Sequence, residues 1–172
     1  MARMLNPLPQ IADYLGRVER VAPVARAHAD WSEQNARPAE AFVDALRTSG
    51  LLRMLVPSDV GGGELSPWVI GPVLEAMSRV DGSAGWTLAL SQGLLTQFLP
   101  KSRYREMFGD GRATVAGSLN PVGARAEVVD GGYRYSGKGT YVSGCTHARW
   151  MMAAAIVTET HYAAPNEAAL DL

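Results

Sequence analysis

Two short segments of this sequence have residue types and spacings that could do chemistry. The glycines at 61–63 invite comparison with phosphate-binding loops, but they lack the GxxxxGK[ST] spacing and follow no predicted parallel strand. Cys145 and His147 lie two residues apart, and alternate residues of a strand share a face, so a nucleophile and base pair is geometrically possible. No third group that would orient the pair can be identified. We therefore favour a flexible glycine turn and a non-catalytic cysteine.

The other polar and aromatic residues do not form a recognisable site. His28, His147 and His161 are far apart and lack metal-ligand spacing such as HExxH, so no metal site is predicted. No pair of carboxylates has a spacing that singles it out for acid–base catalysis. The four tryptophans are interpreted as core or interface residues. Local chemistry alone identifies no reaction and no catalytic residue.

Composition and charge exclude several classes of protein. Of the 172 residues, 47% are hydrophobic and 19% are charged, which is typical of a globular chain. Sixteen basic and 17 acidic residues leave a net charge of -1 without a basic stripe, so nucleic acid and anionic membranes are not expected partners. Cys145 is the single cysteine, which excludes an internal disulfide. Without an apolar run of signal-peptide length at the N-terminus, we expect a cytoplasmic protein.

The first two thirds of the sequence are predicted to be helical. Apolar residues recur at spacings of three and four over residues 11–28, and a second helix after Pro38 is expected to stop at Gly50. Ser66 followed by Pro67 predicts the start of a third helix, which ends near residues 81–82. Ser83 is predicted to cap a long, central and buried helix over residues 84–99.

From about residue 113 the hydrophobic period changes to two. Residues 126–129 and 133–135 predict a hairpin whose glycines supply positive φ. Residues 140–143 predict a further strand, and residues 151–157 predict a strand buried on both faces. Helices followed by strands predict an α+β chain, with an N-terminal α-helical domain over 1–115 and an incomplete β-domain over 116–172.

Four motifs, in this order, resemble the acyl-CoA dehydrogenase superfamily. They are GLLRMLVPSDVGG at 50–62, DGSAGW at 81–86, GKGTYVSG at 137–144 and HARW at 147–150. The resemblance implies an N-terminal helical domain followed by part of an antiparallel β-barrel. The family's C-terminal helical bundle, which completes the flavin pocket and forms the homotetramer, does not fit after Val157. The chain is therefore expected to be an N-terminal portion of such a protein.

The form of the motifs is closer to the two-component flavin-dependent monooxygenases than to fatty-acyl dehydrogenases. That branch implies a flavin, FAD or FMN, as cofactor. It also implies a flavin reductase as partner, which delivers the reduced flavin, and a small organic molecule as substrate. An acyl-CoA dehydrogenase that oxidises an acyl thioester remains an alternative, as does a non-catalytic truncated module.

The resemblance also implies which residues contact the flavin. Ser143 falls at the hydroxyl position near flavin N5, where a hydroxyl can donate or accept a hydrogen bond. Its neighbours in the motif and the residues of a second, flavin-contacting loop complete the predicted set, namely Tyr141, Val142, Gly144, Ser118, Leu119 and Asn120. Leu119 stands where the dehydrogenase pattern has threonine, which argues against the dehydrogenase alternative.

Overall fold

The computed structural model describes residues 8–92, 99–111 and 113–158, which form helices followed by a small sheet region. The α+β class is therefore confirmed. The chain divides into two compact units, of which the first comprises Met1–Gly117 and Ser143–Met152 and the second Ser118–Val142 and Ala153–Leu172. The predicted division into domains at residue 115 stays a prediction. No helix within the described ranges has the length and apolar character needed to cross a membrane.

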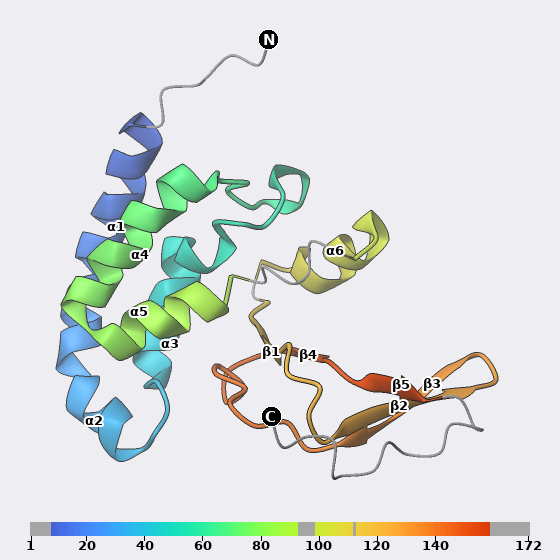
Figure 1. Ribbon diagram of the computed structural model, residues 1–172. Helices are drawn as coiled ribbons and strands as arrows, with labels where there is room; N and C mark the ends of the chain where they lie inside the picture. The colour runs from blue at the N-terminus through green and yellow to red at the C-terminus, as the bar shows by residue number, and fades with distance from the viewer. Residues whose placement is uncertain (1–7, 93–98, 112, 159–172) are drawn as a thin grey trace. The chain divides into compact units, whose positions relative to one another are not determined.

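The first unit is built on a helical core. Its described helices are α1 (Leu8–Ala27), α2 (Ala29–Gln34), α3 (Glu40–Ser49), α4 (Pro67–Val80), α5 (Gly82–Leu90) and α6 (Lys101–Phe108), with 3-10 turns η1 (Leu51–Arg53) and η2 (Ser58–Val60) (Figure 1). Helices α1, α3, α4 and α5 bury one face each in a common cluster. On α4 the buried residues Val69, Val73 and Met77 follow the three-and-four spacing that predicted the helix.

The helix ends follow the predicted signals in part. Gly50 has φ +76° and ends α3, as predicted. Ser66 precedes α4, also as predicted, although its side chain makes no capping hydrogen bond. The prediction that Ser83 caps α5 is wrong, because Asp81 adopts an extended conformation and accepts a hydrogen bond from the Ala84 N–H at 2.7 Å.

Helix α5 is shorter and less buried than predicted. It ends at Leu90 instead of residue 99, and residues 93–98 lie outside the described ranges. Gly85 packs so closely on α4 that a Cβ would lie 2.1 Å from the Ser78 Oγ. This contact buries one face of the helix and leaves the opposite face outward, where Trp86 is 60% exposed. The prediction of a long, central and buried helix is therefore wrong for its length and for this outward face.

The strands within the described ranges form two small sheets. Strand β1 (Val115–Ser118) pairs with β4 (Trp150–Ala153), and the second sheet has the order β3 (Gly132–Gly137), β2 (Ala124–Val129), β5 (Ile156–Thr158). Strands β2 and β3 form the predicted antiparallel hairpin, with Gly131 at φ +77° in its turn. Strands β2 and β5 are parallel, so the expectation of purely antiparallel pairing is wrong for this pair.

Two other strand predictions are also wrong. Residues 140–143 are not a strand, because Tyr141 at φ +55° and Gly144 at φ +89° are left-handed, and residues 143–147 form a turn. Residues 151–157 divide between β4 and β5, which belong to different sheets. Their side chains are not buried on both faces, since Met151 and Val157 are exposed. A continuous apolar run does not reveal where a chain leaves one sheet for another.

Gln92 joins the turn η1 to helix α5 inside the core. Its side chain is fully enclosed, with 2% of the residue exposed. The amide oxygen accepts from the Met54 N–H at 3.1 Å, and the amide nitrogen donates to the carbonyls of Leu51 at 2.7 Å and Leu88 at 3.0 Å. One side chain thus satisfies backbone groups of two elements that are distant in sequence.

Replacing this amide tests how much it stabilises the fold. Gln92→Ala is expected to lower the free energy of unfolding by about 2–3 kcal/mol, because it leaves a buried N–H and a buried carbonyl unpaired. Urea denaturation measures the loss. The matched control, Gln34→Ala on the exposed end of α2, is expected to change the free energy of unfolding by less than about 0.5 kcal/mol. Equal losses in the two variants would contradict the assigned role of Gln92.

Candidate functional site

The turn over residues 143–147 carries two of the predicted flavin contacts, Ser143 and Gly144. It belongs to the same compact unit as the helices, although it follows them by many residues. Its backbone closes with a hydrogen bond from the His147 N–H to the Gly144 carbonyl at 3.2 Å. The contacts that hold this 143–147 turn define the candidate site.

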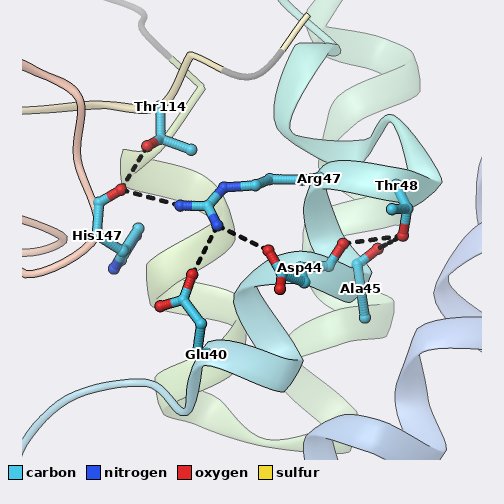
Figure 2. A network of polar contacts seen from close by, with 7 residues as sticks. All are labelled: Glu40, Asp44, Ala45, Arg47, Thr48, Thr114 and His147. Atoms are coloured by element: carbon cyan, nitrogen blue, oxygen red, sulfur yellow. Dashed lines mark hydrogen bonds and ion pairs between the residues drawn. The ribbon is translucent and has the colours of Figure 1, made fainter.

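The carbonyl oxygen of His147 is held by two donors (Figure 2). Arg47 of α3 donates from Nη2 at 3.2 Å, and the Thr114 hydroxyl donates at 2.6 Å. The Nη1 of Arg47 also binds Glu40 and Asp44, each at 2.8 Å. Burial of the guanidinium opposes its charge, but the hydrogen bonds to the two carboxylates prevail and raise the pKa of Arg47 above its ordinary value. Arg47 is therefore a charged, oriented donor to the turn.

The imidazole of His147 faces helix α5. Its Nε2 lies 3.4 Å from the Ser91 Oγ, whereas its Nδ1 is buried without a protein partner among the described residues. Burial lowers the pKa of His147 below its ordinary value, and the nearby charge of Arg47 lowers it further. The ring is therefore neutral at pH 7 and adds no charge to the site.

Trp86 and Ser143 meet on the exposed face of α5. The indole N–H donates a hydrogen bond to the Ser143 Oγ at 3.1 Å, across 57 residues of sequence. Trp86 was not predicted as a site residue, because the tryptophans were interpreted as core or interface residues. Helical spacing offers a signal, since the buried positions Ala84 and Leu88 leave residue 86 on the other face.

Gly144 lets the turn approach the helix in a left-handed conformation. A Cβ at this position would lie 3.4 Å from the His147 Nε2 and 3.5 Å from the Ser91 Oγ. The φ of +89° is one that residues with side chains rarely adopt. Glycine at position 144 thus lets the backbone turn immediately after Ser143, whose side chain contacts α5.

The other five predicted flavin contacts belong to the second unit, namely Ser118, Leu119, Asn120, Tyr141 and Val142. Ser118 and Asn120 make a local turn, in which the Ser118 Oγ accepts from the Asn120 N–H at 3.2 Å. The Asn120 side chain in turn accepts from the Val122 N–H at 3.1 Å. Leu119 is exposed, and Tyr141 is 94% exposed. These five residues stay predicted contacts.

The glycine cluster at 61–63 is a structural turn, as favoured by its sequence. The three N–H groups donate to backbone carbonyls, those of Ser58, Pro57 and Arg53 respectively, so none is free to bind a phosphate. A Cβ on Gly62 would lie 1.8 Å from the Val56 carbonyl oxygen, which excludes any side chain. The turn is therefore tightly packed, in contrast to the flexibility expected for it.

The predicted strand that would place Cys145 and His147 on one face does not exist, because both lie in the 143–147 turn. Cys145 is exposed, whereas the His147 ring faces Ser91. Over the described ranges, no group of three or more His, Cys, Asp or Glu residues could hold a metal ion.

The amino-acid sequence matches a known family over its helical region. Residues 18–102 match the acyl-CoA dehydrogenase N-terminal domain, a span that runs from α1 to the start of α6. The chain belongs to the acyl-CoA dehydrogenase superfamily. The predicted family is thereby confirmed.

Curated members of this superfamily are similar to the chain beyond the helical domain. A pigment production hydroxylase of Rhodococcus sp. is 32% identical over 150 residues, which cover 86% of this chain and 38% of the relative. The oxygenase component of an FADH2-dependent resorcinol hydroxylase of Rhizobium sp. is 35% identical over 149 residues, covering 83% of this chain and 36% of the relative. The chain thus spans less than two fifths of the length of these relatives.

A solved structure of the superfamily has the same fold over this region. XiaF from Streptomyces sp., in complex with FADH2 and glycerol, superposes with a TM-score of 0.84 at 25% identity. The superposition covers 90% of this chain and 39% of XiaF. The order of helices and strands in this acyl-CoA dehydrogenase-like chain is therefore that of its superfamily.

The contribution of Arg47 can be measured by a conservative replacement. Arg47→Lys is expected to lower the free energy of unfolding by about 1–2 kcal/mol, because one ammonium group cannot reproduce the fork that binds two carboxylates and the His147 carbonyl. The control is Arg79→Lys, whose exposed pair with Glu75 is expected to contribute less than about 0.5 kcal/mol. A loss at Arg47 no larger than at Arg79 would contradict the anchoring role.

The lowered pKa of His147 has a consequence for stability. Because the folded state holds this proton less tightly than the unfolded state, the free energy of unfolding is expected to fall as the pH drops below 6.5. In His147→Gln, the part of this decrease in the free energy of unfolding that comes from protonation of His147 is expected to disappear. Urea denaturation at pH 7.5 and 5.5 measures the difference, with His28→Gln as the control for histidine replacement. If the free energy of unfolding decreases as much in His147→Gln as in the wild type, the lowered pKa of His147 is refuted.

Proposed function

We propose that this chain provides the helical domain and the first β-strands of the oxygenase component of a flavin-dependent monooxygenase. The observation that carries the proposal is the similarity to the resorcinol hydroxylase oxygenase component, which extends over 83% of this chain at 35% identity. XiaF, which has the same fold, binds FADH2. Since these relatives are more than twice as long, the activity is proposed for a protein to which the chain contributes this part.

The residues around Ser143 fit a flavin. A flavin ring is flat and aromatic and has hydrogen-bonding atoms at its edge. The chain offers an exposed indole at Trp86 and a hydroxyl at Ser143, 3.1 Å from the indole nitrogen, on the same compact unit. Gly144 adds no side chain beside the hydroxyl. This combination of an open aromatic surface and a fixed hydroxyl suits a flat ligand with a polar edge.

When bound, reduced flavin supplies the electrons with which molecular oxygen is activated. The part of this chain in that chemistry is to bind and orient. Ser143 would hold the edge of the ring through its hydroxyl group. Arg47 and Thr114 would keep Ser143 in place by fixing the His147 carbonyl. The neutral imidazole of His147 adds no positive charge to the turn that carries this hydroxyl.

The proposed partners follow from this chemistry. A reductase that delivers the reduced flavin is the proposed protein partner, because the similar resorcinol hydroxylase is an oxygenase component that depends on FADH2. The substrate class is a small organic molecule, as the name of the resorcinol hydroxylase indicates for that relative. The cytoplasm is the proposed compartment, where reduced nicotinamide for such a reductase is available.

Titration with flavin tests the proposal on the 172-residue chain itself. We expect saturable binding of FMN or FAD, weaker than in a full-length oxygenase, and a loss of affinity of roughly 2- to 12-fold in Ser143→Ala, the range expected for one hydrogen bond. Fluorescence titration of the oxidised flavins and absorbance titration of the anaerobically reduced flavins provide the two measurements. Ser66→Ala, which removes an exposed hydroxyl that makes no capping hydrogen bond, serves as the control and should bind flavin like the wild type.

The alternatives predict different outcomes. With a flavin reductase, NADH and resorcinol, formation of a hydroxylated product above the level of the reductase alone would favour an oxygenase, because free reduced flavin consumes oxygen without the chain. Reduction of the bound flavin by an acyl-CoA without any reductase would favour a dehydrogenase. Absence of binding by either flavin in both oxidation states would favour a non-catalytic module.

A further inference from the structure

We propose that Trp86 is a positioning residue that orients the hydroxyl group of Ser143 toward the flavin. The proposal rests on the proposed function and adds to it a residue that acts through another. Its basis is the hydrogen bond from the Trp86 indole N–H to the Ser143 Oγ, with a nitrogen–oxygen distance of 3.1 Å. Within the described part of the chain, no other side chain makes a hydrogen bond with the Ser143 Oγ, so the indole sets the orientation of this hydroxyl.

The chemistry of the two groups determines what the contact does. An indole N–H can only donate, whereas a serine hydroxyl has one hydrogen and two lone pairs. The bond from Trp86 therefore occupies one lone pair of the Ser143 Oγ. The hydroxyl hydrogen must then point away from the indole, and the second lone pair stays available. Without Trp86 the hydroxyl group would rotate among several partners, including water.

This arrangement suits a ligand atom that changes its hydrogen-bonding character. The N5 atom of a flavin accepts hydrogen bonds in the oxidised ring and carries a hydrogen in the reduced ring. With Trp86 as a fixed donor, Ser143 can donate its own hydrogen to the oxidised form. It can accept from the reduced form through its remaining lone pair. The same pair of residues thus serves both oxidation states without a change of backbone.

Burial does not account for the position of Trp86. Its side chain lies on the outward face of α5 and is 60% exposed, so the indole contributes little to the core. The backbones on both sides of the hydrogen bond are nevertheless fixed. Gly85 packs against Ser78 of α4, and the 143–147 turn is held by the bond from Arg47 to His147. The position of Trp86 is therefore set by its hydrogen bond to Ser143 and not by packing in the core.

A double-mutant cycle on flavin affinity tests the proposal. The variants are Trp86→Phe, Ser143→Ala and the combination of both, and the measured quantity is the Kd for FMN and FAD, oxidised and anaerobically reduced. Phenylalanine keeps an aromatic ring but removes the N–H. Each single variant is expected to weaken binding roughly 2- to 12-fold, and the double variant no more than Ser143→Ala alone, because Trp86 acts through Ser143. Trp68→Phe, on an 82% exposed side chain of α4, is the control and should bind like the wild type.

The two proposals fail in different ways. If the wild type binds flavin but the losses in the two single variants multiply in the double variant, Trp86 does not act through Ser143, and the positioning proposal is overturned while the flavin site stands. If the wild type binds no flavin in either oxidation state, both proposals are overturned. Retention of the Trp86→Phe effect in a Ser143→Thr background, which keeps the hydroxyl group, would support positioning.

A measurement without flavin checks the contact itself. The indole N–H resonance of Trp86, assigned by its disappearance in Trp86→Phe, is expected to shift in Ser143→Ala because the acceptor is lost. It is expected to stay in place in Ser118→Ala, which removes a hydroxyl from the second unit. An unchanged resonance in Ser143→Ala would overturn the proposal whatever the flavin titration gives.

Discussion

The carbonyl oxygen of His147 is the atom on which the candidate site depends. Arg47 and Thr114 reach it across 100 and 33 residues of sequence, and together they fix the turn that carries Ser143. The guanidinium can do this because Glu40 and Asp44 keep it charged and directed. A ligand contact on a turn is only as precise as the anchor of that turn, so the helical core determines the geometry of the site.

Local signals predicted most of the helical part because they involve neighbouring residues. Gly50 ends a helix by its own backbone preference, and Pro67 starts one for the same reason. The choice between Asp81 and Ser83 as the cap of α5 could not be made locally, because both residue types cap helices well. The strand predicted at 140–143 failed because long-range hydrogen bonds hold its end in a turn instead of a ladder.

The candidate site shows the same division between local and distant information. Ser143 and Gly144 were predicted as flavin contacts from the order of family motifs, which is information about the chain as a whole. Trp86 and Arg47 were not, since their roles arise from partners 57 and 100 residues away. The periodicity of α5 would have shown that residue 86 faces outward, but not what it meets there.

The first compact unit is discontinuous, because residues 118–142 separate its helices from the segment Ser143–Met152. During synthesis the helices can begin to pack before the turn that docks on them has been made. At the usual rate of translation, synthesis of the residues between Gly117 and Met152 takes roughly 2–7 s, far longer than helix packing requires. Throughout that interval Arg47 lacks its carbonyl acceptor and Trp86 lacks Ser143. The two segments of this unit are therefore synthesised at separate times. Between them, the helical surface that later contacts the turn is exposed to solvent and to chaperones.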